Sequence, residues 1–165
     1  MRKIVMLVGL VVALTACGSV GEIRPDKRYR MSSASMEPTL SEGSPFVAEV
    51  VEPGNYQPRT GDVVVFTPPE TWPSGELDEV WVFRVLAVPG DTISCCDPQD
   101  RVIRNGTPLD EPYARKTEYD PPAVFEPVTV PAGNVFLLGD HRGLANDSSY
   151  NGAVPVENVI GVVKL

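Results

Sequence analysis

The sharpest local group of residues that could do chemistry is a serine-rich stretch before a proline, Ser33-Ala-Ser35-Met36-Glu37-Pro38-Thr39-Leu40. A serine hydroxyl becomes a nucleophile when a neighbouring base accepts its proton. On composition alone, the same stretch is typical of a turn or a helix cap. The chain has one histidine, His141, which leaves little freedom for Ser/His/Asp chemistry. Taken by itself, the stretch therefore supports either a nucleophile or a turn.

Charge and cysteine content exclude two classes of function. The 165 residues include 22 Asp and Glu against 14 Lys and Arg, a formal charge of −8, and nothing resembles a basic stripe that could hold phosphates. One His and three Cys, two of them adjacent, cannot supply the three or four ligands of a zinc site at normal spacing. We therefore expect no nucleic-acid partner, no metal site and no cofactor.

The elements that must position the serines are predicted to be short strands in one domain. Little helical periodicity is present, and apolar runs rich in Val, Ile and Phe are separated by Pro and Gly, which favours a mainly β fold. We predict strands over residues 46–51, 62–66, 80–88, 101–104, 128–130, 135–138 and 159–164. Asn105-Gly106 predicts a tight hairpin turn. Residues 94–132, rich in Pro, Asp and Glu, predict a less regular subdomain.

The first sixteen residues are predicted to be a signal peptide. Arg2 and Lys3 precede an uncharged, mostly apolar stretch of 13 residues, shorter than the roughly 20 that span a bilayer. The sequence Leu14-Thr15-Ala16-Cys17 resembles the lipobox of bacterial lipoproteins, which implies a lipid (palmitate-type) anchor on Cys17. An ordinary cleaved signal with an incidental cysteine is the alternative. Removing sixteen residues, two of them basic, leaves 149 residues with a charge of −10.

Two further regions carry weaker predictions. Residues 17–30 are polar and contain four basic residues, so they predict either a solvated linker or a segment that favours anionic lipid headgroups. Extended, residues 18–30 reach roughly 40 Å. A disulfide between the adjacent Cys95 and Cys96 would strain their peptide, so we expect two thiols or a bond to another molecule.

Three more motifs follow the serine stretch in order: Gly61-Asp62-Val-Val-Val-Phe66, then Arg84-Val-Leu-Ala-Val-Pro-Gly-Asp91, then Gly139-Asp140-His141-Arg142 with Asp147-Ser148 and Gly152. Together the four motifs resemble the bacterial type I signal peptidases, serine endopeptidases that cut secretory signal peptides after small residues. The resemblance covers residues 31–165. It implies a mainly β fold, a signal-peptidase-like antiparallel β core with a smaller inserted β subdomain.

The resemblance also implies roles for individual residues. Ser35 matches the nucleophile, and its main-chain N–H and the Ser33 hydroxyl match the donors aimed at the oxyanion. Met36 and Leu40 match positions near the small apolar pocket for substrate side chains. Three residues match structural supports of the site: Arg84, Asp91 and Asp147.

The chain departs from the family at the base. The catalytic lysine of the family stands immediately before the Arg of the third motif, where this chain has Phe83, and a phenyl ring cannot accept a proton. The serine that orients the lysine is replaced by Ala145, and an arginine that pairs with the Asp is replaced by Ser149. Strand alternation places Phe83 on one face with Trp81, Val85 and Ala87, pointing into the site.

Other bases have weaker support. Lys27, Lys116 and Lys164 lie in the linker, the irregular subdomain and the carboxyl end, and no motif places them at the serine. His141 stands where the family usually has Asn, and it is an alternative base or an ordinary loop histidine.

Two functions therefore remain open. The first is a membrane-anchored, impaired serine endopeptidase of the signal peptidase type, acting on or binding secretory signal peptides at the extracytoplasmic face of a bacterial membrane. The second is a non-catalytic lipoprotein that uses the peptidase fold to bind an extended peptide or a protein. Cleavage that disappears in Ser35→Ala would distinguish the first from the second.

Overall fold

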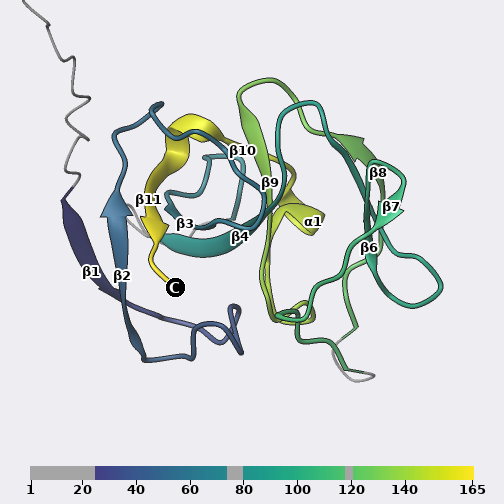
Figure 1. The fold of residues 1–165 in the computed structure, drawn as a ribbon, viewed down its shortest axis with the longest axis horizontal. Helices are drawn as coiled ribbons and strands as arrows, with labels where there is room; N and C mark the ends of the chain where they lie inside the picture. The colour runs from purple at the N-terminus through teal and green to yellow at the C-terminus, as the bar shows by residue number, and fades with distance from the viewer. Residues whose placement is uncertain (1–24, 74–79, 118–120) are drawn as a thin grey trace, which may run out of the picture.

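Two antiparallel sheets make up the fold, and they lie side by side in Figure 1. The structure is a computed structural model that describes residues 25–73, 80–117 and 121–165. The predicted signal peptide, Cys17 and most of the predicted linker lie outside the described residues. Within the described residues, no helix is long and apolar enough to cross a membrane.

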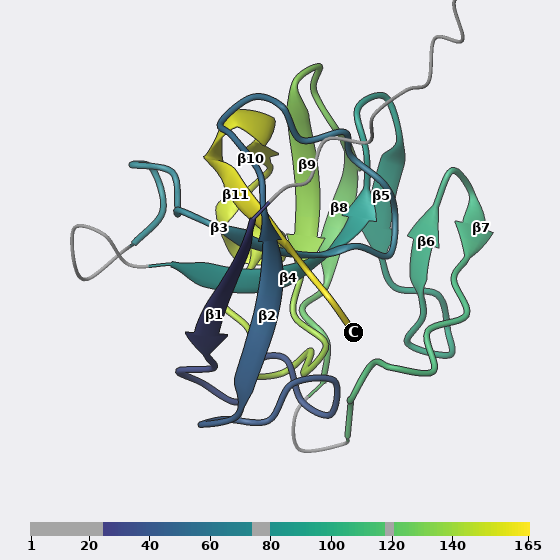
Figure 2. The same cartoon turned by 60° about the vertical axis from the view of Figure 1, so that its left-hand side comes forward.

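The larger sheet has seven strands in the order β1-β2-β11-β3-β4-β9-β10. Its strands are β1 (Asp26–Arg30), β2 (Pro45–Val50), β3 (Val63–Phe66), β4 (Trp81–Ala87), β9 (Asn134–Leu138), β10 (Val154–Pro155) and β11 (Val159–Val163). The smaller sheet, in the order β7-β6-β5-β8, consists of β5 (Thr92–Cys95), β6 (Val102–Arg104), β7 (Thr107–Pro108) and β8 (Phe125–Thr129). All four of its strands come between β4 and β9 in the chain, and Figure 2 shows them beside the larger sheet.

These sheets confirm the predicted mainly β fold with a smaller inserted sheet. Each of the seven predicted strands coincides with an observed one, with ends that differ by up to three residues. The Asn105-Gly106 hairpin is also confirmed, because both residues have positive φ, 51° and 77°, and they join β6 to β7. The short strands β5, β7 and β10 were not predicted, since two to four residues give little pattern to detect.

The end of the predicted linker, by contrast, belongs to the fold. Asp26–Arg30 forms β1, which pairs with β2 over five residues at the edge of the larger sheet. Its Tyr29 ring stacks on Phe46 at 5.4 Å, and Asp26 pairs with Lys164 at 2.6 Å. The hydrophobic pattern missed this strand because four of its five side chains are charged and exposed.

The prediction of two thiols, or of a bond to another molecule, is wrong. Cys95 and Cys96 are joined by a disulfide at the end of β5, where the chain leaves the strand. The remaining cysteine of the sequence is Cys17, outside the described residues, so the described part of the chain offers the pair no other partner.

Strand β9 separates two hydrophobic clusters. Its Val135 and Leu137 belong to the cluster of the larger sheet, while Phe136 and Leu138 belong to the cluster beneath the smaller sheet. Because side chains alternate along a strand, one strand lines both clusters. The prediction that Ala87 shares a face of β4 with Trp81, Phe83 and Val85 is wrong, because Ala87 packs in the second cluster. The pairing of β4 with β9 shifts register between Val85 and Ala87, which turns Ala87 to the other side.

Candidate active site

The serine stretch forms the connection between β1 and β2. Main-chain hydrogen bonds close this loop, from Met31 N to Ser44 O at 2.9 Å and from Leu40 N to Met36 O at 3.0 Å. Within it, the hydroxyls of Ser33 and Ser35 lie 3.0 Å apart, and Ser35 N is 3.5 Å from Ser33 Oγ. The loop therefore brings together the predicted nucleophile and the predicted oxyanion donor. Ser33 is exposed, whereas Ser35 is nearly buried.

The loop that follows β9 contacts the main-chain carbonyl of Ser35. His141 N donates to Ser35 O at 2.9 Å, and Gly139 approaches the same oxygen closely. A Cβ built on Gly139 would lie 2.7 Å from Ser35 O and 2.3 Å from the Cβ of Ala145. Only a glycine fits where the chain at residue 139 passes Ser35 O and Ala145. This explains why the fourth motif begins with a glycine.

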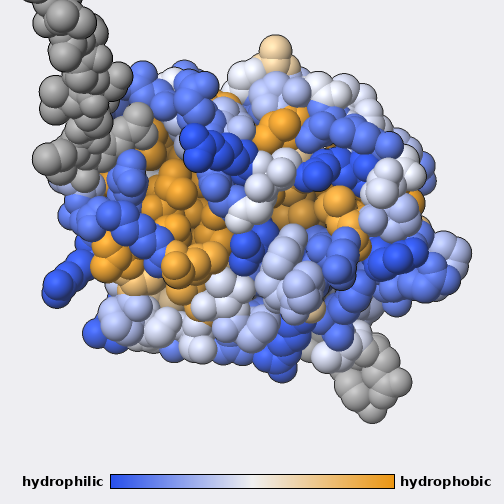
Figure 3. Space-filling model, viewed as in Figure 1, coloured by the Kyte–Doolittle hydropathy of each residue, from blue (hydrophilic) through white to orange (hydrophobic). Residues whose placement is uncertain are grey.

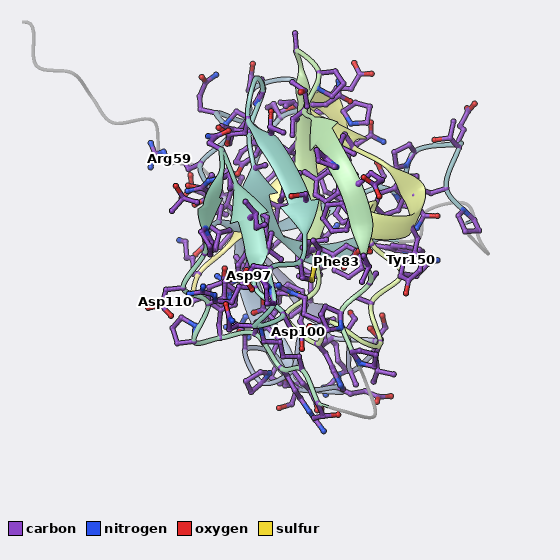
Figure 4. The ribbon with its side chains drawn as sticks, turned by 90° about the vertical axis from the view of Figure 1, so that its right-hand side faces the viewer. Arg59, Phe83, Asp97, Asp100, Asp110 and Tyr150 are labelled. Carbon is purple, nitrogen blue, oxygen red and sulfur yellow. A yellow bond between two sulfur atoms is a disulfide. The ribbon has the colours of Figure 1, made fainter. Side chains whose placement is uncertain are left out.

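Phe83 occupies the space beside Gly139 and the serine loop. Its ring is 3% exposed, and its Cε1 would be 3.4 Å from the same built Cβ on Gly139. Figure 4 shows Phe83 in the interior, while Tyr150 and Asp110 lie toward the periphery. Phe83 also contacts the rings of Phe66 and Trp81, with centroids 5.8 and 6.0 Å away. The position at which the resemblance implies a catalytic lysine is thus part of an aromatic cluster.

The described lysines make their contacts elsewhere. Lys27 Nζ lies 5.0 Å from the ring centroid of Tyr29, Lys116 Nζ donates to Asp100 O, and Lys164 Nζ pairs with Asp26. Among the described residues, the hydroxyl of Ser35 has Ser33 Oγ as its single hydrogen-bond partner. The His141 side chain is buried and is not part of that contact.

Arg84, the residue after Phe83, is held by a buried carboxylate. Its Nε and Nη2 donate to the two oxygens of Asp140 at 2.8 and 2.6 Å, and its Nη1 donates to Gly61 O at 2.9 Å. Burial lowers the pKa of the Arg84 guanidinium, but the hydrogen bonds and charge of Asp140 outweigh this and hold the pKa above its usual value. Thr39 Oγ1 also donates to Asp140, which ties the serine loop to the same pair.

A second buried ion pair reaches the site from the inserted segment. Arg142 donates to both oxygens of Glu111, at 2.7 and 3.0 Å, and both side chains are 4% exposed. Tyr113 lies under the Arg84 guanidinium, 3.9 Å from ring centroid to Cζ. Arg115 N donates to Asp140 O at 2.7 Å. Sequence reasoning gave no role to Glu111 or Tyr113, and it quoted Asp140 only as part of the fourth motif, because no local signal links positions so far apart.

Asp147 and Asp91 have different surroundings. Asp147 caps α1 (Ser148–Asn151), and its carboxylate accepts from Gly139 N, Ser149 N and Ser149 Oγ at 2.9, 2.9 and 2.6 Å. Burial raises the pKa of Asp147 despite these hydrogen bonds. Ser149, which stands where the resemblance implies an arginine, therefore contacts this carboxylate. Asp91 accepts from Val88 N and Asn105 Nδ2 at 3.1 and 2.7 Å, so it braces the junction of the two sheets.

A groove of about 380 Å³ opens beside the serines. Its lining is mostly apolar and consists of Tyr29, Arg30, Met31, Ser32, Ser33, Ser35, Phe46, Val80, Trp81, Val82, Phe83, Leu144 and Asn146. Met36 and Leu40, predicted near the substrate pocket, lie in the core of the larger sheet instead and are not part of this lining. Figure 3 shows hydrophobic residues gathered on the face over the larger sheet.

The described residues contain no group of three or more His, Cys, Asp or Glu side chains that could hold a metal ion. The polar groups that the described structure places at the groove include the hydroxyls of Ser33 and Ser35 and the side chains of Arg30 and Asn146.

Comparison with known proteins supports the same family. The family model described as "Signal peptidase, peptidase S26" matches residues 1–165. The chain is 38% identical over 159 residues to "Probable signal peptidase I-1" of Synechocystis sp., covering 94% of this chain and 76% of that protein. It is 36% identical over 138 residues to "Signal peptidase I" of Leptolyngbya laminosa, covering 82% of this chain and 65% of that protein.

A solved structure has the same fold. The crystal structure of a signal peptidase I from Enterococcus faecalis V583 superposes with a TM-score of 0.54 at 26% identity, covering 66% of this chain and 98% of that one. With four motifs in order, two sheets and paired serines at one groove, this chain belongs to the signal peptidase family, peptidase S26.

Proposed function

We propose that this protein is a membrane-tethered signal-peptidase-like domain that binds secretory signal peptides in the groove beside Ser35 and cleaves them slowly at most. The observation that carries this proposal is the position of Phe83, which fills the space next to Ser35 and Gly139. The oxyanion donors and the buried supports are retained, while the proton acceptor is lost.

The loss of the base limits the first step of peptide cleavage. Ser35 must give up its hydroxyl proton as it attacks a carbonyl, and its hydrogen-bond partner, the Ser33 hydroxyl, is no base at neutral pH. Loss of a general base typically lowers a rate by about 10² to 10⁴, while oxyanion donors alone retain some catalysis over water. We therefore expect residual cleavage rather than efficient turnover.

The groove itself supports peptide binding. Strand β4 pairs with β3 from Trp81 onward, but its pairing with β9 begins at Arg84. In the described structure, the main chain of residues 81–83 thus has a neighbouring strand on one side only, and these residues line the groove. An extended peptide placed there would add a strand through main-chain hydrogen bonds. Its apolar side chains would contact Tyr29, Trp81 and Leu144.

The tether is the second part of the proposal. Cys17 follows a lipobox-like sequence, and the described fold begins with β1 at Asp26. A lipid on Cys17 would leave only eight residues between the anchor and β1, a reach of roughly 26 to 29 Å. The domain would then work at the extracytoplasmic face of a bacterial membrane, next to translocated signal peptides.

The alternative is a lipoprotein that binds a peptide or protein and performs no chemistry. Phe83 and Ala145 together favour this alternative, because both changes fall on the same proton-transfer unit. One experiment separates the two functions: purified protein and Ser35→Ala are incubated with a signal-peptide substrate while binding and cleavage are both measured. Slow cleavage that Ser35→Ala abolishes supports a residual peptidase. Equal binding with no cleavage in either protein supports the binding module, and efficient wild-type turnover would show that a base exists.

A further inference from the structure

We propose that the groove recognises the free C-terminal carboxylate of an extended peptide, so that its preferred ligand is a peptide already cleaved rather than an intact precursor. This inference rests on the proposed peptide binding in the groove and adds the chemical class of the ligand. It is carried by the hydrogen-bond donors and the charge along the groove.

The donors are clustered at the serines. The hydroxyls of Ser33 and Ser35 lie 3.0 Å apart and share one hydrogen bond, which uses one of their two protons. The second hydroxyl proton remains available to an acceptor. Ser35 N is 3.5 Å from Ser33 Oγ, beyond the usual N–H···O range, so this N–H can also serve a better acceptor. Two donors, this hydroxyl proton and the Ser35 N–H, are therefore available to a ligand oxygen at the serines.

Asn146 adds a third donor to the groove lining. Its Oδ1 accepts from Asn151 Nδ2 at 2.9 Å, an arrangement that leaves the Asn146 amide nitrogen to donate. A carboxylate, with two oxygens and about four lone-pair sites, can accept from several such donors at once. The single carbonyl oxygen of an intact peptide bond offers only two lone-pair sites.

The charge of the lining favours an anion. The protein carries a formal charge of −8, yet none of the described residues that line the groove is Asp or Glu. Arg30 is the charged residue of that lining, and its Nη1 donates to Gly43 O. The guanidinium has five N–H donors, so this contact leaves others for a ligand. A hydrogen bond to a charged group stabilises more than one between neutral groups.

Phe83 strengthens the preference of the groove for a carboxylate. A lysine at position 83 would be the base of a peptidase, whereas the phenyl ring offers neither an acceptor nor a charge beside Ser35. The serine hydroxyls then have no base to donate to within the described site. A carboxylate supplies the acceptor that the lost base no longer provides.

The open edge of β4 favours a peptide over another amphiphilic acid. A fatty acid has an apolar chain and a carboxylate, but it cannot pair with the main chain of residues 81–83. A peptide uses both features, because its backbone pairs with this edge while its terminus reaches the serines. We therefore commit to a peptide as the occupant.

The test uses the full-length protein and three acetylated peptides with the sequence of residues 11–16, Val-Val-Ala-Leu-Thr-Ala. One ends in a free carboxylate, one in an amide, and one continues with Gly-Ser-amide. Titration calorimetry at pH 7 measures their dissociation constants. We expect the free acid to bind about 10-fold to 100-fold more tightly than the amide and the longer peptide.

Variants locate the effect. Ser33→Ala and Arg30→Gln should each reduce the advantage of the free acid over the amide, while Arg28→Gln, on the same strand but not in the groove lining, should preserve it. Equal affinity for all three peptides would overturn the carboxylate inference and leave peptide binding intact. Displacement of the free acid by decanoate at equal concentration would overturn the peptide as occupant. No binding of any peptide would overturn the proposed function itself.

Discussion

Arg84 and Asp140 form a buried, two-point ion pair that joins β4 to the loop after β9. The two hydrogen bonds measure 2.8 and 2.6 Å, and the side chains are 7% and 0% exposed. Phe83 immediately precedes Arg84, and His141, which contacts Ser35 O, immediately follows Asp140. The pair therefore holds the two chain segments that flank the serine.

Removing one partner of this pair should destabilise the fold. In Asp140→Asn the Arg84 charge stays buried without its counter-ion, and we expect a loss of about 3–5 kcal/mol in the free energy of unfolding, measured by urea denaturation. Asp26→Asn, which breaks the exposed pair with Lys164, is the matched control and should leave the unfolding midpoint nearly unchanged. Similar losses in both variants would contradict the structural role of the buried pair.

Restoring the proton acceptor should restore cleavage. In the double variant Phe83→Lys with Ala145→Ser, a lysine and the hydroxyl that orients it stand beside Ser35, and we expect signal-peptide cleavage to rise by about 10² to 10⁴. The same double variant with Ser35→Ala is the control and should be inactive. If the double variant keeps its circular dichroism and unfolding midpoint but stays inactive, then Phe83 and Ala145 are not the only obstacles to catalysis.

A single methyl group at Gly139 should disturb the serine loop. In Gly139→Ala the added Cβ would meet Ala145 Cβ at 2.3 Å and Ser35 O at 2.7 Å, and such overpacking typically costs about 1–3 kcal/mol. Adding Ala145→Gly removes the first contact but not the second. Thermal unfolding should therefore show partial recovery in the double variant, whereas full recovery would mean that the approach to Ser35 O is unimportant.

Tyr113 should ionise late in an alkaline titration. Burial, with the nearby charge of Glu111, raises the pKa of Tyr113 from 10.0 to about 12 in the folded protein. A raised pKa stabilises the fold fully below the unfolded value near pH 10, and this contribution is lost as the pH rises through about 12. Burial raises the pKa of Tyr56 as well, so tyrosinate absorbance should show a late rise whose amplitude is smaller in Tyr113→Phe, and an unchanged amplitude would contradict the buried position of the Tyr113 ring.

Cys17→Ala tests the lipid tether. If a lipid on Cys17 holds the protein, this variant should shift from the membrane fraction to the soluble fraction or remain with an uncleaved signal of altered mass. Mass spectrometry of the purified wild-type protein should show the added acyl mass on Cys17. An unmodified Cys17 in a protein that stays with the membrane would refute the lipid as the tether.

Several parts of this structure are predictable from local sequence. Strands rich in Val, Ile and Phe, such as β3 and β4, follow from residue type and flanking turns, and the Asn105-Gly106 hairpin follows from the backbone conformation that these two residues tolerate. β1 is not predictable in this way, because its stability comes from pairing with β2 and from Tyr29 packing on Phe46. The Cys95–Cys96 bond depends on local chain geometry that residue type does not reveal.

By itself, the sequence determined the strand pattern, the motif order that places the chain in its family and the presence of Phe83 where the resemblance implies a catalytic lysine. Those properties depend on residue identity and short spacing along the chain. Only the tertiary structure decided that Phe83 packs beside Ser35 and that Glu111 and Asp140 support the arginines of the site. It also decided that Met36 and Leu40 lie in the core and that the groove lining presents donors and Arg30. Contacts between residues tens of positions apart arise from packing, and no local pattern encodes them.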